Sequence, residues 1–213
     1  MTDSEQVENE NARVSRIFDE MSKNYDRGMS LVERLILGPA RHWAAAQARG
    51  RVVELAVGTG LNLPLYGPEV EHVVGVDISP RMLDLARTKA AADPRVELRE
   101  GDVQALDLPD ASADTVLSTF TFCTVPDPAR AAAQAYRVLV PGGRIVLAEH
   151  GPSTNRVLRA LQRGIEPLSI LFGADHLLRD PAPYLTEAGF VVDDVHRTGR
   201  MGIVFRVLAH KPA

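Results

Sequence analysis

The stretch RVVELAVGTGLN, residues 51–62, decides how the chain folds. Its first part is a short apolar run rich in valine, and this run ends at Gly58-Thr59-Gly60. A short apolar run bounded by glycines is typical of a buried parallel strand that stops at a tight turn. Glycines let the backbone of such a turn adopt unusual dihedral angles, and they let a ligand approach without a Cβ atom in the way. We therefore predict a strand, a ligand-contacting turn and the start of a helix over residues 61–66.

A second buried strand follows, VVGVD at residues 73–77, and it ends in an acid. A strand, a glycine turn, a helix and a strand ending in an acid form the nucleoside-binding half of a Rossmann-like sheet. A dinucleotide site needs a small third residue after the two glycines, where this chain has Leu63. The first strand also carries Glu54, whose charge would repel a pyrophosphate and attract an ammonium or sulfonium group. The pattern therefore favours S-adenosylmethionine (SAM) over a nicotinamide dinucleotide.

Four segments resemble, in order, the motifs of class I SAM-dependent methyltransferases of the type 11, UbiE-like superfamily. They are VVELAVGTG, VVGVDISPRMLDLAR, LREGDVQALDLPDASADTVLS and RVLVPGGRIVLAEH. The resemblance implies an α/β fold with a Rossmann-like seven-stranded sheet, mostly parallel with an antiparallel strand 7. It also implies an N-terminal helical cap and a helical lid before strand 6. The family's first glycine is Ala56 here, a change of one methyl group that the site is expected to tolerate.

The resemblance also implies the SAM contacts. Asp77 is expected to bind the ribose, Asp102 and Val103 the adenine, and the amides of the helix after the glycine turn the methionine carboxylate. Ile78 and Met82 are expected to wall the adenine or, alternatively, to pack between helix and sheet. The expected set is Tyr25, Glu54, Ala56, Gly58, Thr59, Gly60, Asn62, Asp77, Ile78, Met82, Asp102, Val103, Thr119 and Phe120.

Three residues are candidate catalytic bases: His150 at the end of the fifth strand, His176 before the sixth, and Tyr25 between two N-terminal helices. A neutral histidine accepts a proton at cell pH, although each of the three has a purely structural alternative. No carboxylate motif singles out any one of them as the base, which favours a proximity mechanism and a thiol acceptor, because a thiol with a pKa near 8.5 needs little help. The single cysteine, Cys123, is expected to pack as a small apolar residue. No metal site is expected.

The segments LSTFTFCTV (117–125) and 149–179 resemble a subgroup of small-molecule thiol and phospholipid methyltransferases. The expected reaction is methyl transfer to a small, fairly hydrophobic acceptor, in the first place a thiol of a secondary metabolite or xenobiotic. Alternatives are N- or C-methylation of a membrane lipid, a quinone or another natural product, and a SAM-binding protein without catalysis. The strongly apolar stretch 153–172 is expected to be a lid that bends at Gly164 and Pro167, or an interfacial helix in weak contact with a membrane.

Composition is typical of one globular domain of 213 residues, with 45% apolar and 24% charged residues. The net charge of −4 argues against nucleic acid as an obligate partner. One cysteine excludes a disulfide within the chain and suits a cytoplasmic protein, either a monomer or a homodimer. No apolar stretch is long enough to predict a transmembrane segment.

The chain order predicts how this single domain is divided. Residues 1–10 carry many charges and almost no apolar groups, so we expect them to be disordered. A helical cap is expected over 11–48, with a first helix that ends near residue 24. The SAM-binding half then covers 49–150, and an acceptor lid with a C-terminal hairpin covers 151–213.

Overall fold

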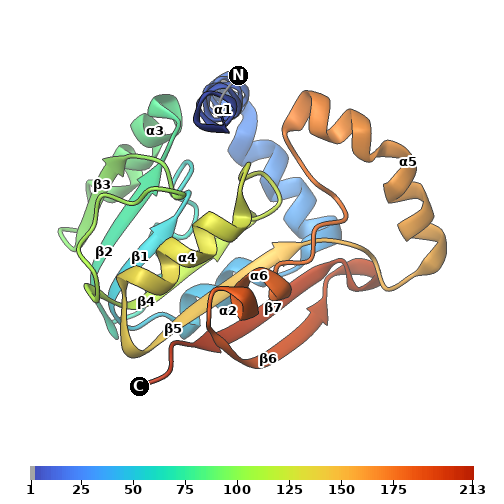
Figure 1. Cartoon of the computed structure of the whole chain (residues 1–213). Coiled ribbons are helices and arrows are strands. Elements are labelled where there is room, and N and C mark those ends of the chain that lie inside the picture. Colours follow the sequence, from blue (N-terminus) through green and yellow to red (C-terminus); the bar gives the residue numbers. More distant parts are fainter. Residues whose placement is uncertain (1–2) are drawn as a thin grey trace.

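The computed structural model describes residues 3–213, which form one seven-stranded sheet with helices on both sides (Figure 1). The strand order is β3-β2-β1-β4-β5-β7-β6. Neighbouring strands are parallel from β3 to β5, and β7 is antiparallel to both of its neighbours, as the Rossmann-like prediction requires. The strands are β1 (Gly50–Leu55), β2 (Val70–Asp77), β3 (Val96–Glu100), β4 (Ala113–Thr119), β5 (Leu139–His150), β6 (Val191–Thr198) and β7 (Val204–His210).

The helices cover both faces of the sheet and leave the carboxyl ends of its parallel strands free for ligands. They are α1 (Asp3–Val32), η1 (Glu33–Leu37), α2 (Ala40–Gln47), η2 (Leu63–Leu65), α3 (Pro80–Ala90), α4 (Pro128–Val138), α5 (Arg156–Gly173), α6 (Ala182–Glu187) and η3 (Arg200–Gly202). Alternate residues of β1 point to opposite faces. Val53 and Leu55 enter the core shared with α4 and α6, whereas Val52 enters the core shared with α2 and α3. The carboxyl ends of the parallel strands thus remain available for ligand binding.

The N-terminal helix is longer than the sequence predicts. Residues 3–10 are helical where we expected disorder, and residues 1 and 2 lie outside the described part. Extending an existing helix costs little, and this segment is rich in glutamate, which favours helices. The expected end near residue 24 is also wrong. The Ser22 hydroxyl donates to the Asp19 carbonyl (2.8 Å) from within α1, so its hydrogen bond is made without ending the helix.

Two further elements differ from the predictions. Only the three-residue 3₁₀ helix η2 follows the glycine turn, because Pro64 comes early and Asn62 provides no side-chain cap. In contrast, α5 is one continuous helix of 18 residues that contains Pro167. Caps at both ends fix its length: the Asn155 side chain accepts from two backbone amides, and Ala174 adopts a left-handed conformation. Glycine and proline therefore do not end the helix, although α5 curves along its length (Figure 1).

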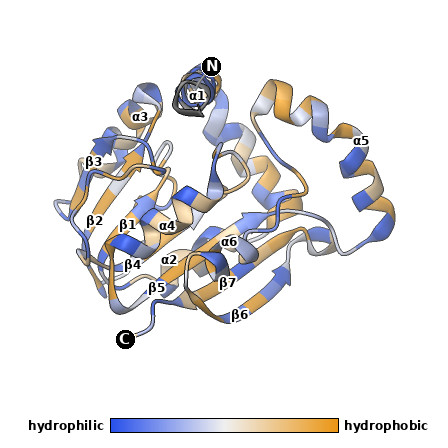
Figure 2. Cartoon of the chain, in the orientation of Figure 1, coloured by the Kyte–Doolittle hydropathy of each residue, from blue (hydrophilic) through white to orange (hydrophobic). Residues whose placement is uncertain are grey.

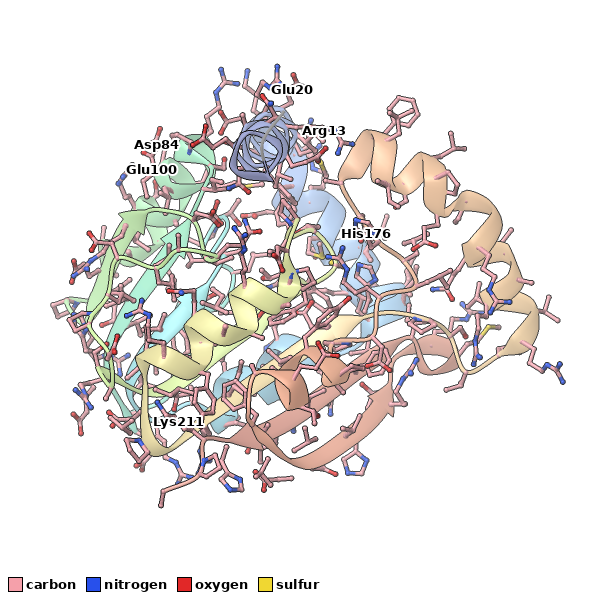
Figure 3. All side chains as sticks on the ribbon, viewed as in Figure 1. Arg13, Glu20, Asp84, Glu100, His176 and Lys211 are labelled. Atoms are coloured by element: carbon pink, nitrogen blue, oxygen red, sulfur yellow. The ribbon has the colours of Figure 1, made fainter. Side chains whose placement is uncertain are left out.

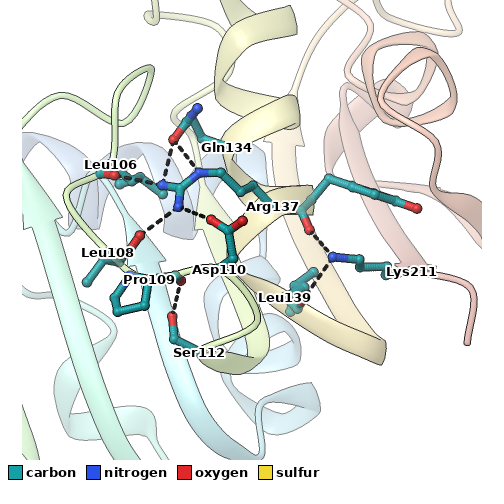
Figure 4. Close-up of polar contacts among 10 residues, drawn as sticks. Leu106, Leu108, Pro109, Asp110, Ser112, Gln134, Arg137, Leu139 and Lys211 are labelled. Atoms are coloured by element: carbon teal, nitrogen blue, oxygen red, sulfur yellow. Dashed lines mark hydrogen bonds and ion pairs between the residues drawn. The ribbon is translucent and has the colours of Figure 1, made fainter.

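Arg137 on α4 holds the loop that leads from β3 to β4 (Figure 4). Its guanidinium donates to the carbonyls of Leu106 (2.7 Å) and Leu108 (2.6 Å), and it pairs with Asp110 at 2.7 Å. The same loop begins with Asp102, a predicted adenine contact, so this clamp supports one side of the site from outside. In residues 3–213, the helices all fall short of the length and apolar content that crossing a bilayer requires.

Candidate functional site

A cavity lies at the carboxyl ends of β1, β2 and β4, next to α1, with an empty volume of about 730 Å³ when its open mouth is included. Most of the predicted SAM contacts line it: Tyr25, Ala56, Gly58, Thr59, Asp77, Ile78, Met82, Asp102, Val103, Thr119 and Phe120. The structure does not bring every predicted residue to the cavity wall. Glu54, Gly60 and Asn62 are not part of it, and neither are His150 and His176.

The glycine turn after β1 adopts left-handed backbone conformations, with φ of +50° at Ala56, +57° at Gly58 and +79° at Gly60. A Cβ atom added at Gly58 would meet nothing closer than the Ala56 carbonyl oxygen at 4.0 Å, so it would project into open space. A Cβ atom added at Gly60 would lie 2.8 Å from the Leu63 side chain and 3.3 Å from Ala86. Gly58 therefore leaves room for a ligand, whereas Gly60 lets α3 pack closely and lies outside the cavity wall.

Asp77 ends β2 and links it to the glycine turn. Its carboxylate accepts from the backbone amides of Gly58 (2.7 Å) and Ser79 (2.8 Å). Burial raises the pKa of Asp77 to about 6, against the opposing effect of these backbone donors. The side chain also lines the cavity. A carboxylate in this position can accept further hydrogen bonds from hydroxyl groups, as the ribose assignment requires.

Glu54 acts behind the cavity instead of in it. Its carboxylate accepts from Asn62 Nδ2 (2.8 Å) and from the Tyr66 hydroxyl (2.6 Å), and burial raises its pKa to about 7. The same Asn62 amide donates to Thr119 Oγ1 (2.9 Å). Glu54 and Asn62 therefore position Thr119, which does line the cavity, while they themselves lie behind its wall.

Arg41 on α2 is a cavity residue that the sequence did not predict. Only 7% of it is exposed, and its Nη1 donates to Thr119 Oγ1 at 2.5 Å. It pairs with Glu33, and its guanidinium lies 5.0 Å from the centre of the Phe120 ring. A buried guanidinium at a ligand cavity is a suitable partner for a carboxylate. One arginine in an alanine-rich helix gives no signal in the sequence, so only the folded chain reveals this role.

At the end of the cavity away from Arg41, side chains from two segments that are distant in the sequence hydrogen-bond to one another. Asn11 Nδ2 donates to Asp102 Oδ2 (2.7 Å), and Gln104 Nε2 donates to Asn11 Oδ1 (2.8 Å). Gln104 Oε1 also accepts from the Asp127 amide (2.7 Å). Gln104 is 6% exposed and lines the cavity. This polar set matches the adenine end that the resemblance implies.

Helix α1 crosses the cavity and is attached to both sides of it. The Ser79 hydroxyl donates to Asp19 (2.6 Å), and the Thr59 hydroxyl donates to Asp26 (2.5 Å), which also pairs with Lys89 at 2.9 Å. Tyr25 lies between these points and lines the cavity. Burial raises the pKa of the Tyr25 phenol, which keeps it protonated at neutral pH and disfavours its predicted role as a base.

His150, a predicted base, lies just outside the cavity wall beside Phe120, with the two rings stacked at 6.5 Å. Its Nε2 atom is 2.9 Å from Asp175 Oδ1, so a carboxylate from a distant segment lies beside this histidine, in addition to its sequence neighbour Glu149. Burial alone would lower the pKa of His150, but Asp175 and Glu149 outweigh it and raise the pKa. A paired carboxylate and histidine is a recurrent general-base arrangement. The only hint in the sequence was that Asp175 precedes the other candidate histidine.

His176 lies on the connection that follows α5 (Figure 3), and its backbone amide donates to the Cys123 carbonyl (2.9 Å). Burial and the charge of Arg179 lower the pKa of its imidazole. Cys123, His150 and Asp175 offer potential metal-ligand atoms within 4.8 Å of one another. Burial and the nearby carboxylates raise the pKa of the Cys123 thiol well above its usual value.

Comparisons with known proteins agree with this geometry. Residues 53–147 match a family described as a methyltransferase domain. The chain is 32% identical to the ubiquinone/menaquinone biosynthesis C-methyltransferase UbiE of Methylobacterium nodulans, over 85% of this chain and 77% of that protein. A solved Thermotoga maritima structure, described as a SAM-dependent methyltransferase and possible histamine N-methyltransferase, is 25% identical, with a TM-score of 0.71. That match covers 92% of this chain and 99% of the other.

Two further relatives cover a shorter part. A demethylmenaquinone methyltransferase of Deinococcus radiodurans is 40% identical over 70% of this chain. A phosphatidylethanolamine N-methyltransferase of Cereibacter sphaeroides is 41% identical over 60% of this chain. The chain spans 65% and 64% of these two proteins, slightly less than two thirds of each.

Proposed function

Because the chain belongs to the UbiE-like class I SAM-dependent methyltransferases, we propose that it moves the methyl group of SAM to a lipophilic aromatic acceptor. The acceptor class is a reduced quinone or a related phenol. The cavity fits SAM: Gly58 leaves open space, Asp77 faces that space from β2, and Arg41 offers a cation to the methionine carboxylate. SAM supplies a reactive methyl group, and the chain supplies the positioning, which is worth up to roughly 7–11 kcal/mol.

The observation that carries the choice of acceptor is the pair of His150 and Asp175, 2.9 Å apart beside Phe120. A thiol needs little help to lose its proton, whereas a phenolic hydroxyl with a pKa near 10 needs a base. The Asp175 carboxylate, 2.9 Å from Nε2, would stabilise the positive charge that His150 gains when it takes the phenolic proton. The negative charge then spreads into the ring, so that a ring carbon or the oxygen can take the methyl group.

The relatives support the same class, since two of those described above are named for quinone methylation. None of them is named for a thiol acceptor, so the thiol predicted from the sequence is now the weaker candidate. A phospholipid amine is the second candidate. It is favoured by the apolar residues that α5 exposes and by the relative named for phosphatidylethanolamine. Such an amine must also lose a proton before it can attack, so His150 would serve it in the same way.

A labelled-methyl assay tests the proposal with three acceptors in detergent micelles: a short-chain demethylated hydroquinone, phosphatidylethanolamine and a hydrophobic thiol. We expect label in the hydroquinone, and a rate at least tenfold lower for His150→Ala. Asp175→Asn should lower the pKa of His150. The methylation rate falls at acid pH because His150 is then protonated, and in this variant that fall should begin at a lower pH. Label confined to the thiol, or an unchanged rate in His150→Ala, would overturn the assignment.

A further inference from the structure

Helix α5 exposes its apolar side and turns a polar side toward the protein. Among its 18 residues, Gln162 alone is buried, and its side chain bonds the Ser153 amide (2.8 Å) and the Gly151 carbonyl (3.0 Å). A surface helix normally does the reverse and buries its apolar stripe. Apolar residues recur along α5, where Figure 2 colours them orange. Their spacing puts the exposed ones on one face: Val157, Leu161, Ile165, Leu168, Leu171 and Phe172, with exposed fractions of 45–80%.

This face continues onto a neighbouring part of the molecule at the start of α5. The Thr154 hydroxyl donates to the carbonyl of Met201 in η3 (2.9 Å), and Met201 is itself 48% exposed. On its other side, η3 adjoins η1, since a Cβ atom at Gly199 would lie 2.9 Å from the Ile36 carbonyl. Leu35 and Ile36 of η1 are also exposed. The exposed apolar residues of α5, together with Met201, Leu35 and Ile36, form one surface, which we call the apolar face.

Cations flank this surface. Arg156 and Arg163 are exposed on α5, on the side next to its apolar stripe, and Arg200 is exposed on η3. The one acid in α5, Glu166, is engaged by the Leu178 amide (3.2 Å). The whole chain carries a net charge of −4, so this excess of positive charge is local. An apolar stripe bordered by arginines matches the interface of a bilayer that contains anionic lipids.

We propose that the apolar face docks the protein on the surface of an anionic bilayer. The inference rests on the proposed function, because a lipophilic acceptor resides in such a bilayer. It also links α5 to that function, because Asp175, two residues after the end of α5, lies 2.9 Å from His150. The segment that contacts the membrane is thus directly continuous with the segment that orients the proposed base.

Sedimentation with vesicles tests the docking, using purified full-length protein without SAM or acceptor. We expect binding to vesicles of phosphatidylglycerol and phosphatidylcholine, and at least tenfold weaker binding to phosphatidylcholine alone. The double variant Leu161→Asp, Leu168→Asp should weaken binding at least tenfold. Arg156→Gln with Arg163→Gln should remove most of the preference for the anionic lipid and its salt dependence. Leu85→Asp is the matched control, because Leu85 is an exposed leucine on α3, and it should bind as the wild type does.

Three results would overturn the docking: wild-type protein that stays in the supernatant, a Leu85→Asp variant as impaired as the double variant, or equal binding to both vesicle types. A wild-type dimer that avoids vesicles, and that the double variant converts to a monomer, would assign the apolar face to a second copy instead. Failure of the proposed function is a separate result. It would appear as missing turnover of a hydroquinone dispersed in detergent, where the double variant and the wild type should have equal rates.

Discussion

At the scale of residues, burial shifts the pKa values of three carboxyl groups in or near the site. Burial raises the pKa of Glu54 and Glu149 to about 7 and that of Asp77 to about 6. An acid with a raised pKa keeps a proton in the folded state that the unfolded chain releases. These three groups therefore lower the free energy of unfolding as pH rises from about 4 toward 7. A cationic ligand bound nearby offsets that cost, because it favours the charged carboxylates.

The first prediction concerns Asp77. SAM affinity should stay constant above pH 7 and fall below about pH 6, by up to roughly tenfold at pH 5, as the carboxylate takes up its proton. Calorimetric titration between pH 5 and 8 measures this dependence. Asp77→Asn is the control, and it should bind SAM more weakly with little pH dependence in this window. A wild-type profile without a fall at acid pH would remove Asp77 from the ribose site.

The second prediction concerns Ala56, a non-glycine residue at a φ of +50°. Left-handed backbone costs an alanine about 1–2 kcal/mol, part of which the greater freedom of an unfolded glycine cancels. Ala56→Gly should therefore raise the free energy of unfolding by about 0.5–1 kcal/mol, measured by urea denaturation. Gly58→Ala, at a φ of +57°, should lower it. If Ala56→Gly destabilises the protein instead, the turn is not strained at this residue.

At the scale of elements, the sequence predicted those site residues that lie within one continuous strand–turn–strand segment. The glycine turn and Asp77 could be predicted from the apolar runs, the glycines and the strand end, whereas Asp102 was implied by the resemblance to the family. Arg41 and Asn11 could not be predicted, because each reaches the cavity only after distant segments pack together. Periodicity also showed that α5 has an apolar face, but it cannot show whether that face points inward or to the solvent.

The third prediction concerns the attachment of α1. Asp26→Ala removes the bond from Thr59 and the pair with Lys89. Because the Asp26 side chain is 45% exposed, the loss should be modest, about 0.5–1 kcal/mol, or a two- to fivefold weaker affinity for SAM. Hydrogen exchange should speed up in α1 as well. Glu20→Ala, on the exposed side of α1, is the control (Figure 3), and an equal effect there would argue against the attachment.

At the scale of the whole molecule, the cavity is assembled from α1, α2 and the ends of three parallel strands, so ligand binding should stabilise the entire domain. SAM at 100 times its dissociation constant should add about 2.7 kcal/mol. For a domain of this size that amounts to a rise of roughly 5–11 °C in the melting temperature. A thermal shift assay measures it, with NAD as the control ligand. An equal rise with NAD would contradict the choice of donor.

Helix α1 also sets a condition on repeated catalysis. It lies across the cavity and is tied to both rims through Asn11, Asp19 and Asp26. We expect release of S-adenosylhomocysteine to require local opening of these ties and to limit the steady-state rate. Solvent viscosity or a weakened tie should then change that rate and leave the first turnover unchanged.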